Sequence, residues 1–336
     1  MGLTSVSAPS SDPNLEDFLR HGGRLAAARR AFPDAPTPWL DLSTGINPRP
    51  WKGARATAAS LTRLPDPDEI TALEAAAAAA FGVSQDRVAA VPGAEAALRA
   101  LPRLLGARSV AIAAPTYGGH AEAWRLAGAK VQCVAPADLA AAASEAVVVV
   151  NPNNPDGARR ENLEAGERWL IVDESFVETA PELSVAARAG GRLIVLRSFG
   201  KFYGLAGVRL GFVVAEPGLA ARVGAQFGDW PVSAEAIAAG TAAYADVAWR
   251  ERTAARLTRD AARLDALLVG AGFEIVGGTS LFRLAATPDA ARRFTALARL
   301  GVLTRPFPDQ PTWLRFGLPK PEDWPRLQLA LEGSRR

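Results

Sequence analysis

The chain has little that could cross-link it or hold it in a membrane. Cys133 is its only cysteine, which excludes an internal disulfide bond. Because Cys133 lies in an apolar, strand-like segment, we expect it to be buried as a small hydrophobic residue. No apolar run approaches the roughly 20 residues that span a bilayer, and the first residues lack the pattern of a signal peptide. These absences predict a cytoplasmic protein without membrane contact and with a frayed N-terminal tail at residues 1–14.

The chain also has little excess of one charge over the other. The formal net charge is +3, although the pI is about 9.3, and the basic residues are scattered along the chain. This pattern argues against nucleic-acid binding. We also expect no bound metal ion. Of the 38 basic residues only four are lysines, at positions 52, 130, 201 and 320, so arginine is the usual cation of this chain and each lysine is notable.

Between residues 66 and 214, helical patterns alternate with short apolar runs, which is typical of a sheet with crossover helices. Most of the runs are continuously apolar, as expected of strands that are covered on both faces. One helix, at residues 71–81, has Asp66 and Asp68 as candidate caps and Gly82 as its end. The predicted strands lie at residues 87–91, 109–114, 130–135, 146–150, 169–172, 192–196 and 208–214. We therefore predict an α/β fold with a central, mostly parallel sheet of about seven strands.

The pattern changes after residue 230. A long helical stretch at residues 234–272 leads to shorter predicted strands at residues 273–276, 280–285, 302–306 and 312–318. A chain of 336 residues is long enough for one large domain and a smaller one. The expected parts are an N-terminal segment (1–46) that packs with the small domain and covers the active site, a large domain (47–231), and a small α+β C-terminal domain (232–336).

The segment SFGKFYGLAGVRLG, residues 198–211, carries the strongest functional signal. Lys201 lies on a glycine-rich loop directly after an apolar strand, with Ser198 three positions before it and Arg209 eight after it. A loop at the carboxyl end of a strand faces the crevice in which α/β proteins bind ligands. A lysine that forms a Schiff base needs a partly desolvated site that favours its neutral amine. A surface loop with an incidental lysine is the alternative, and the whole fourteen-residue pattern argues against it.

Other polar residues also follow predicted strands. Asp173 comes after WLIV, where a buried carboxylate could pair with a protonated pyridine nitrogen, although a lone aspartate at a strand end is usually a cap. Asn154 lies in the turn NPNNPDG and could donate to a phenolic oxygen. Tyr117, in APTYGGH, could stack on a flat ring or simply pack in the core.

A glycine joins another strand to the start of a helix in VPGAEAAL. Gly93 leaves the backbone amides of Ala94 and Glu95 pointing outward at the positive end of the helix dipole. This arrangement predicts a phosphate-binding site. Taken alone it is weak, because most strand–glycine–helix junctions are only turns.

Together and in this order, GAEAAL, PTYGGH, NPNNPDG, DESF and SFGKFYGLAGVRLG resemble the class I and II aminotransferases, which are fold-type I enzymes. The resemblance implies pyridoxal 5′-phosphate as cofactor and Lys201 as the catalytic residue that carries it. It implies that Asp173 pairs with the pyridine nitrogen and that Asn154 contacts the ring hydroxyl. The residues implied to bind the cofactor are Gly93, Ala94, Glu95, Tyr117, Asn154, Asp173, Ser198, Lys201 and Arg209.

The residues that would bind the substrate need evidence of their own, because the fold does not define the reaction. The segments HGGR (21–24), DLSTGINPRP (41–50) and DESF together resemble the threonine-phosphate decarboxylases of cobalamin biosynthesis. This resemblance implies L-threonine O-3-phosphate as substrate and (R)-1-amino-2-propanol O-2-phosphate as product. It implies that Arg315 binds the substrate carboxylate. The substrate phosphate would be held by His21, Gly22, Asn47 and Arg305.

Two residues depart from the pattern of related enzymes. Phe176 stands where most aminotransferases have a tyrosine that tunes the ring hydroxyl, which favours the decarboxylase branch. Leu64 stands where relatives often have a tyrosine that reaches the cofactor of a neighbouring subunit. A homodimer is still expected, but sharing of the active site between subunits is less certain.

Two other functions compete with decarboxylation. A histidinol-phosphate aminotransferase would make the same demands for a phosphate and a carboxylate. A non-catalytic binding protein with the same fold is a rival of another class. We expect the anchored substrate phosphate to place the bond between Cα and the carboxylate perpendicular to the cofactor ring, so that the carboxylate leaves.

Overall fold

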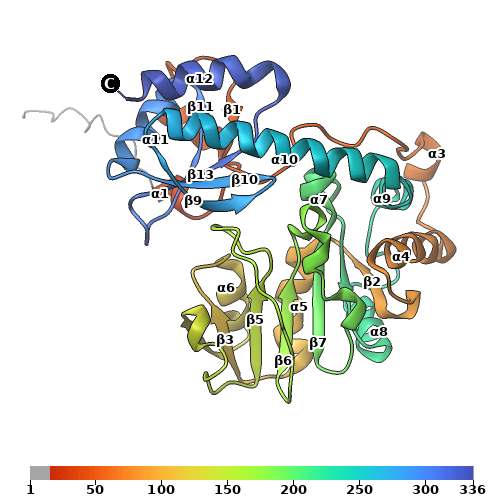
Figure 1. The fold of residues 1–336 in the computed structure, drawn as a ribbon. Coiled ribbons are helices and arrows are strands. Elements are labelled where there is room, and N and C mark those ends of the chain that lie inside the picture. The colour runs from red at the N-terminus through yellow and green to blue at the C-terminus, as the bar shows by residue number, and fades with distance from the viewer. Residues whose placement is uncertain (1–15, 336) are drawn as a thin grey trace, which may run out of the picture.

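Figure 1 shows the computed structural model of the chain, which describes residues 16–335. The frayed tail predicted at residues 1–14 lies outside these residues. The described residues form a lower part built on one large sheet and an upper part built on smaller sheets (Figure 1). The long helix α10 (Val247–Gly270) runs from the upper part to α9 (Ala234–Ala245) above the large sheet.

All seven predicted strands of the large sheet form, in the order β2-β8-β7-β6-β5-β3-β4. The neighbours from β7 to β4 pair in parallel, whereas β8 is antiparallel to both β7 and β2. The predicted α/β fold with a mostly parallel sheet is therefore confirmed. The strands are β2 (Val88–Val91), β3 (Ser109–Ala113), β4 (Lys130–Val134), β5 (Ala146–Val150), β6 (Trp169–Asp173), β7 (Leu193–Ser198) and β8 (Gly211–Val214).

Helices cover both faces of this sheet, which explains why its central strands are continuously apolar. Alternate side chains of one strand enter different cores: Ile171 packs in the core with α5, α6 and α8, while Leu170 and Val172 pack in the core with α4 and α9. The covering helices are α4 (Pro67–Phe81), α5 (Ala94–Leu105), α6 (Gly119–Leu126), α8 (Pro217–Ala225) and α9.

Strand β4 is the exception: it lies at one edge of the sheet, and unlike β2 at the other edge it is not buried. Its Cys133 is exposed, so the prediction of a buried cysteine is wrong. The strand is apolar enough to resemble a core strand, but no further strand pairs with it beyond β3. Within residues 16–335 no helix is both long and apolar enough to cross a membrane.

Helix α4 ends where the sequence predicts but begins earlier. Asp66 is the N-cap; its carboxylate accepts a hydrogen bond from the Asp68 amide, and Glu69 completes a capping box. Of the two candidate caps, Asp66 is therefore the one used. Gly82 ends the helix in the left-handed region, at φ 71°.

The single helical stretch predicted at residues 234–272 is divided into α9 and α10. Asp246 separates them: its carboxylate caps α10 by accepting the Trp249 amide at 3.0 Å and also accepts the Trp51 indole N–H at 3.1 Å. An aspartate favours helix caps over helix interiors. The break therefore lies at the residue whose side chain can replace the missing backbone bonds.

The upper part contains an antiparallel sheet of four strands in the order β12-β13-β10-β9. The segment 302–306 was predicted as one strand, but it forms two short strands in different sheets. The first, β11, pairs in parallel with β1 of the N-terminal segment. The strands are β1 (Leu40–Asp41), β9 (Glu274–Thr279), β10 (Phe282–Ala286), β11 (Val302–Leu303), β12 (Arg305–Pro306) and β13 (Trp313–Gly317).

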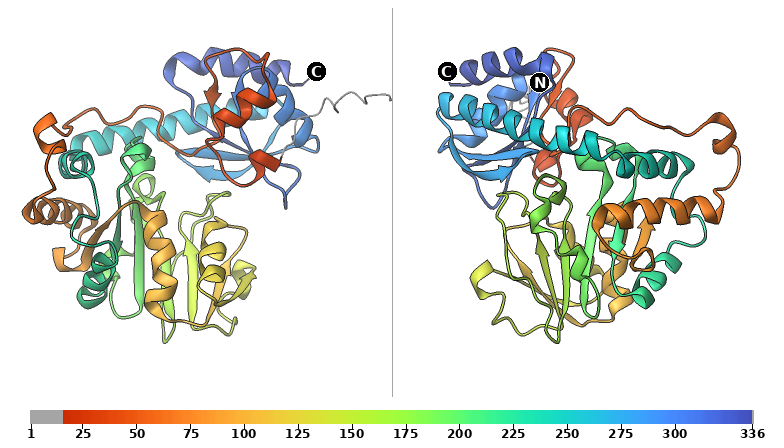
Figure 2. Two further views of the ribbon diagram at one scale, coloured as in Figure 1. Left: turned by 180° about the vertical axis from the view of Figure 1, so that it is seen from behind. Right: turned by 45° about the vertical axis from the view of Figure 1, so that its right-hand side comes forward.

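The N-terminal segment lies against this upper part, as Figure 2 shows from two further directions. Besides the β1–β11 pairing, Phe18 packs against Phe294 with ring centroids 5.3 Å apart. The remaining helices are α1 (Glu16–Leu19), α2 (Leu25–Ala31), α3 (Ala58–Leu61), α7 (Phe199–Phe202), α11 (Ala290–Arg299) and α12 (Trp324–Gly333).

Candidate active site

A cavity of about 430 Å³ lies at the carboxyl ends of the parallel strands, where the N-terminal segment and β13 meet the large sheet. Twelve of the fourteen residues predicted for the site line it. From the upper part and N-terminal segment these are His21, Gly22 and Arg315, and from the large sheet they are Gly93, Ala94, Glu95, Tyr117, Asn154, Asp173, Ser198, Lys201 and Arg209. The two that do not line it are Asn47 and Arg305.

Lys201 lies on the short helix α7, directly after β7. Its amino group is 3.4 Å from the Ser198 hydroxyl and 5.0 Å from the centre of the Phe176 ring. Burial lowers the pKa of Lys201, and the cations Arg315 and Arg209 act in the same direction, against the opposing effect of Asp173. The site therefore favours the neutral amine, which is the nucleophilic form.

Asp173 ends β6 beside Lys201 and is held by two hydrogen bonds. One carboxylate oxygen lies 3.0 Å from His120 Nε2, and the other accepts the Ser175 amide at 2.9 Å. Burial, the largest single effect, would raise the pKa of Asp173, but the interactions with His120, Lys201 and Ser175 together outweigh it and lower the pKa to about 2. The cavity therefore keeps a buried, ionised carboxylate.

His120 contacts the site through Asp173, and the sequence did not indicate it. It is one of only two histidines in the chain, and it closes the PTYGGH segment from which Tyr117 was selected. The side chain is buried on α6 and points at Asp173. Its rarity was the available signal, but its partner lies 53 positions away in the sequence.

The predicted phosphate-binding junction has the expected geometry. Gly93, at φ 90°, joins β2 to α5, and no side chain among residues 16–335 caps this helix. A side chain at Gly93 would lie 2.7 Å from Arg209 Nη2, so the glycine lets the guanidinium pack against the helix start. First-turn amides, an arginine and the Ser198 hydroxyl thus meet in one corner of the cavity, and this donor set fits a phosphate group.

Tyr117 is fixed by a hydrogen bond from its hydroxyl to Glu95 at 3.1 Å. Glu95 is itself paired with Arg99 at 2.7 Å. Burial, with a further contribution from Glu95, raises the pKa of the Tyr117 hydroxyl, so the phenol stays neutral. The ring lies between His21 and His120, with a centroid separation of 6.1 Å to each.

Arg315 extends from β13 and lines the side of the cavity that lies opposite the large sheet. One of its nitrogens donates to Asn154 Oδ1, and another donates to the Ser43 carbonyl at 2.9 Å. Its Nε is buried with no partner among the described residues. Burial, and to a lesser extent Arg305, lowers the pKa of Arg315 to about 9, so the group remains a cation at neutral pH. Because the Asn154 oxygen is used, its amide nitrogen remains as a donor.

His21 and Gly22 bring the N-terminal segment over the cavity. Burial lowers the pKa of His21, and the nearby Arg305 and Arg20 lower it further. A side chain at Gly22 would lie 2.2 Å from the Ser43 carbonyl oxygen, so only glycine allows this close approach. The next amide, that of Gly23, donates to the Ser43 hydroxyl at 2.7 Å.

Asn47, which the sequence predicts to contact the substrate, does not line the cavity. Its side chain is buried, donating to the Phe202 carbonyl at 2.9 Å and accepting from Arg256 at 2.9 Å. Its backbone amide donates to the Lys201 carbonyl at 2.9 Å. These bonds place Asn47 beneath α7, and the residues of its segment that line the cavity are Ser43, Thr44, Gly45 and Ile46.

Arg305 lies beside the cavity rather than in its wall. It is directly opposite Arg315 in the β12–β13 pair, and one nitrogen donates to the Arg20 carbonyl at 2.9 Å. Its Nη1 is buried and has no partner within residues 16–335. Burial lowers the pKa of Arg305 to about 10, which still leaves it charged at neutral pH.

The sequence did not reveal an aromatic pair, here called the aromatic wall, in which Phe176 lines the cavity and Phe282 packs against it. Phe176 and Phe282 meet edge to face with centroids 5.0 Å apart. A side chain at Gly45 would lie 2.9 Å from Phe282 and 3.0 Å from Phe176. Gly45 therefore lets the backbone lie against both rings, one from the turn after β6 and the other from β10.

The chain belongs to the aminotransferase class I and II family, whose profile it matches over residues 27–327. Two curated relatives cover nearly all of it. A threonine-phosphate decarboxylase of Pseudomonas aeruginosa is 40% identical, with 94% of this chain and 98% of the relative aligned. A threonine-phosphate decarboxylase of a Sinorhizobium species is 42% identical, with 89% and 92% aligned.

The fold is also found among solved structures. A histidinol-phosphate aminotransferase of Sinorhizobium meliloti, solved in complex with pyridoxal 5′-phosphate, matches with a TM-score of 0.80 and 21% identity over 99% of both chains. At this identity the likeness concerns the fold. Membership of the family agrees with the resemblance in the motifs and with the architecture of the described residues.

Proposed function

We propose that this enzyme uses pyridoxal 5′-phosphate to decarboxylate L-threonine O-3-phosphate, giving (R)-1-amino-2-propanol O-2-phosphate for cobalamin biosynthesis. One observation carries the proposal: a buried lysine and an ionised aspartate at the end of the sheet line the same cavity as Arg315 of the small sheet and His21 of the N-terminal segment. The relatives at 40% and 42% identity are named for this substrate and this reaction.

The cavity fits the cofactor. The uncapped start of α5 with Arg209 and Ser198 suits its phosphate, and the charged Asp173 suits a protonated ring nitrogen. Lys201 is the residue for covalent attachment, and Tyr117 and Asn154 complete the set. When bound, pyridoxal phosphate supplies a ring that withdraws electrons and stabilises negative charge on a substrate carbon.

The substrate carries two anionic groups, and two arginines are available for them: Arg315 lines the cavity and Arg305 lies beside it. Arg315 presents a buried guanidinium whose Nε is free of any described partner, which suits the carboxylate. Arg305 Nη1 is also free of described partners, and with His21 and the backbone at Gly22 it suits the substrate phosphate. Asn47 is removed from this set, because its side chain is used elsewhere.

After the carboxylate leaves as carbon dioxide, the substrate Cα must take up a proton. Lys201 is the titratable amine that lines the cavity, and burial makes it give up a proton more readily than an exposed lysine does. The phenyl ring of Phe176 lies near this amine and has no hydroxyl to donate. In our proposal Lys201 or water delivers the proton to Cα.

The substrate test separates decarboxylation from transamination. Purified enzyme is given threonine phosphate, or histidinol phosphate with 2-oxoglutarate, and carbon dioxide and glutamate are measured. We expect carbon dioxide from threonine phosphate and no glutamate from the second mixture. Glutamate without carbon dioxide would overturn the proposal in favour of an aminotransferase, and protein without cofactor absorbance would favour a binding protein.

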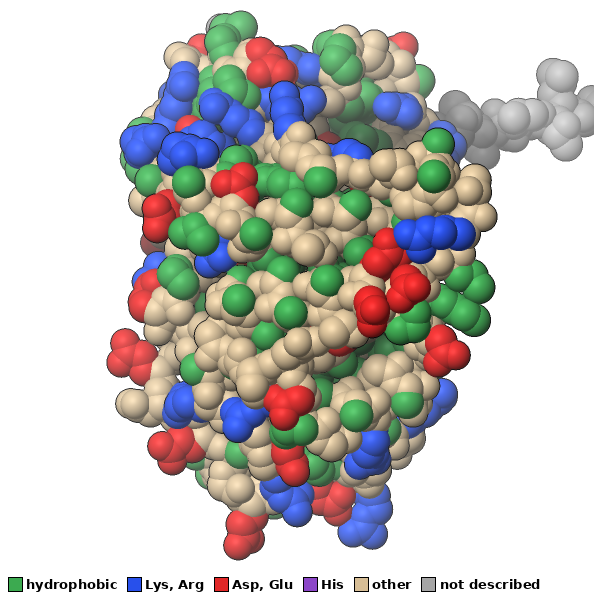
Figure 3. Space-filling model, turned by 90° about the vertical axis from the view of Figure 1, so that its right-hand side faces the viewer, with side chains coloured by type: hydrophobic (Ala, Val, Ile, Leu, Met, Phe, Trp, Pro, Cys, Tyr) green, Lys and Arg blue, Asp and Glu red, His purple; other side chains and the backbone are tan. Residues whose placement is uncertain are grey.

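We further propose a homodimer in the cytoplasm, with the domain division 1–46, 47–231 and 232–336. Support for the dimer comes from exposed large apolar side chains near α3 and α9, namely Leu61, Leu64, Trp230 and Val247, which are 63%, 62%, 52% and 52% exposed. Figure 3 views this side of the molecule: apolar side chains lie over its middle, and most charged side chains lie toward its edges. Light scattering should give twice the chain mass, and a Trp230→Glu/Leu64→Glu double variant should shift this toward a monomer.

A further inference from the structure

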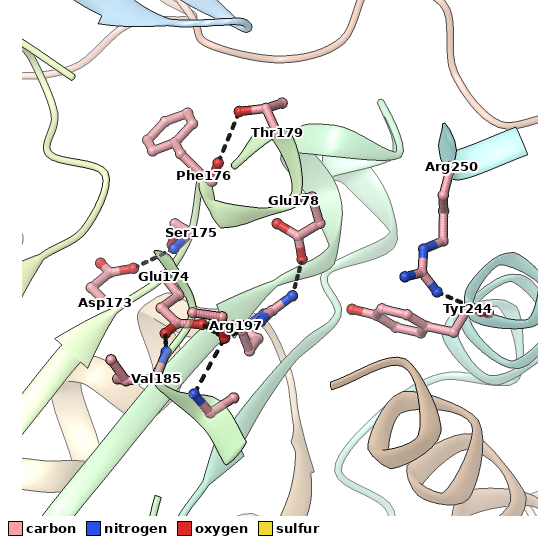
Figure 4. Close-up of polar contacts among 12 residues, drawn as sticks. Asp173, Glu174, Ser175, Phe176, Glu178, Thr179, Val185, Arg197, Tyr244 and Arg250 are labelled. Atoms are coloured by element: carbon pink, nitrogen blue, oxygen red, sulfur yellow. Dashed lines mark hydrogen bonds and ion pairs between the residues drawn. The ribbon is translucent and has the colours of Figure 1, made fainter. Parts of the chain in front are cut away.

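Three charged side chains form a buried cluster behind the cavity: Glu174, Glu178 and Arg197. Arg197 Nη1 is 3.0 Å from Glu174, and its Nη2 is 3.0 Å from Glu178. The side chains of Arg197, Glu174 and Glu178 are only 7%, 0% and 7% exposed. Figure 4 shows the guanidinium between the two carboxylates. This cluster takes no part in the function proposed above.

The buried cluster is joined directly to residues of the cavity through the two strand ends. Side chains alternate along a strand, so Asp173 and Ser198 face the cavity whereas their neighbours Glu174 and Arg197 face away from it. The Glu174 amide donates to the Leu196 carbonyl at 2.9 Å, which keeps β6 and β7 in register at this point. A shift of the Arg197–Glu174 pair would therefore move both Asp173 and Ser198.

Glu178 connects the cluster to the aromatic wall. It lies in a short turn, Val177–Thr179, that directly follows Phe176. The Thr179 hydroxyl donates to the Phe176 carbonyl at 3.2 Å, so this turn is fixed at both ends (Figure 4). The Phe176 ring is in turn 5.0 Å from the Lys201 amine. The salt bridge between Arg197 and Glu178 therefore restrains Phe176, whose ring lies beside the Lys201 amine.

The two carboxylates differ in how fully they are bound. Both oxygens of Glu174 are used: they accept the Val185 amide at 2.6 Å and the Ser184 hydroxyl at 2.8 Å, besides Arg197. Glu178 Oε2 is buried without a described partner. Arg197 is thus the principal partner of Glu178 in the structure, and the position of Glu178 depends on it.

The segment after Lys201 also reaches the cluster. Tyr203 contacts Tyr244 with ring centroids 5.2 Å apart, and Figure 4 shows Tyr244 directed toward the cluster. Burial raises the pKa of both tyrosine hydroxyls, and the negative charge of Glu178 contributes to each shift. Three segments that carry cavity residues, 173–178, 197–198 and 201–203, therefore meet around one arginine.

We propose that Arg197 is a positioning residue of the active site, which holds Asp173 and Phe176 in place relative to Lys201 by joining Glu174 and Glu178. A planar guanidinium can bind two carboxylates at once, which the single ammonium of lysine does less well. The inference rests on the proposed function in one respect, that Lys201 carries the cofactor. A purely structural Arg197 would affect stability and nothing else.

The main test replaces Arg197 by lysine and uses Arg293→Lys as a matched control. Both arginines are buried over a phenylalanine ring, at 4.3 Å from Phe81 and 4.5 Å from Phe273, but Arg293 lies on α11, away from the cavity. Each variant should melt at a lower temperature than the wild type. Only Arg197→Lys should also weaken cofactor binding and kcat, each by about tenfold, because the binding groups are misplaced.

A second variant, Glu178→Gln, keeps the shape of the side chain and removes its charge. The negative charges of Asp173 and Glu178 and the positive charges of Arg315 and Arg209 all act on Lys201. Removing one carboxylate disfavours the protonated form of the Lys201 nitrogen, so the pH midpoint of the absorbance change of the bound cofactor should fall by about half a unit. This readout does not depend on turnover, and it decides the case even if Arg197→Lys fails to fold.

Two results would overturn the inference. One is Arg197→Lys with wild-type cofactor affinity and kcat although it has lost as much stability as Arg293→Lys. The other is Glu178→Gln with an unchanged pH midpoint. If the wild type itself binds no cofactor, the proposed function fails as well, whereas wild-type binding without decarboxylation would leave the role of Arg197 standing.

Discussion

The two sides of the cavity are built differently. On the sheet side, Asp173 and Lys201 come from neighbouring parallel strand ends, and Asp173 is bound by His120 and the Ser175 amide. On the opposite side, Arg305 and Arg315 donate mainly to backbone carbonyls, and each keeps a buried nitrogen without a partner in the described part of the chain. A completed hydrogen-bond set indicates a preformed site, whereas free buried donors indicate a site that a ligand completes.

The largest expected effect comes from the sheet side. Lys201→Ala removes both the attachment point and the amine that can move a proton, so we expect kcat to fall by at least about a thousandfold. Carbon dioxide release measures the rate, and the absorbance spectrum of the protein measures the cofactor linkage. Cys133→Ser is the control, since that side chain is exposed on the edge strand. Activity close to wild type in Lys201→Ala would remove this residue from the chemistry.

A smaller effect is expected from the opposite side. Arg315→Lys keeps the charge but loses the planar fork, so kcat/KM for threonine phosphate should fall by about 30-fold to 100-fold, mostly through KM. The absorbance of the bound cofactor should stay as in the wild type, because the sheet side is unchanged. A variant that loses its cofactor instead would show that the two sides are not separable.

The charge of Asp173 should appear in the pH dependence of stability. Its folded pKa, about 2, lies below its usual value of 3.8, so ionised Asp173 stabilises the fold above pH 4, and this contribution is lost as the pH falls toward 2. The difference corresponds to about 2 kcal/mol in the free energy of unfolding. Denaturant unfolding at pH 6 and pH 3 should show a smaller difference for Asp173→Asn than for the wild type. Equal differences would mean that Asp173 titrates normally.

The smallest expected effect concerns His21 and Asn47, which the sequence analysis assigns together to the substrate phosphate. His21→Ala should raise KM for threonine phosphate by roughly fivefold to tenfold, because a lining hydrogen-bond donor is lost. Asn47→Ala should leave KM unchanged and lower the melting temperature, because its bonds hold the loop beneath α7. A raised KM in both variants would return Asn47 to the substrate site.

The sequence predicted the cavity residues best where they lie at or just after the end of a strand. Asp173, Ser198 and Lys201 are all within a few residues of a buried apolar run, and parallel strands bring such ends to one edge of the sheet. His120 and Gly45 were missed, since the partner of His120 is 53 positions away and the rings against Gly45 come from the distant segments of Phe176 and Phe282. Patterns of strands and turns do not encode such meetings.

Asn47 and Arg305 show the same limit on the substrate side. Both belong to segments that reach the cavity, but the side chain of Asn47 binds the Phe202 carbonyl and Arg256, and that of Arg305 binds the Arg20 carbonyl. A resemblance in motif assigns a segment to a site. Successive side chains of an extended segment point to opposite sides. A difference of one position along the backbone therefore decides which side chain faces the ligand.

The chain's local order of apolar runs, glycines and polar strand ends was enough to determine the α/β class, the seven-stranded sheet and the place of Lys201, because these depend on periodicity and on short-range turn chemistry. Only the tertiary structure decided which cations keep a free buried donor and how Arg197 ties the strand ends together. Those features arise from burial and from contacts between segments far apart in the sequence, where desolvation makes each unpaired or paired charge matter.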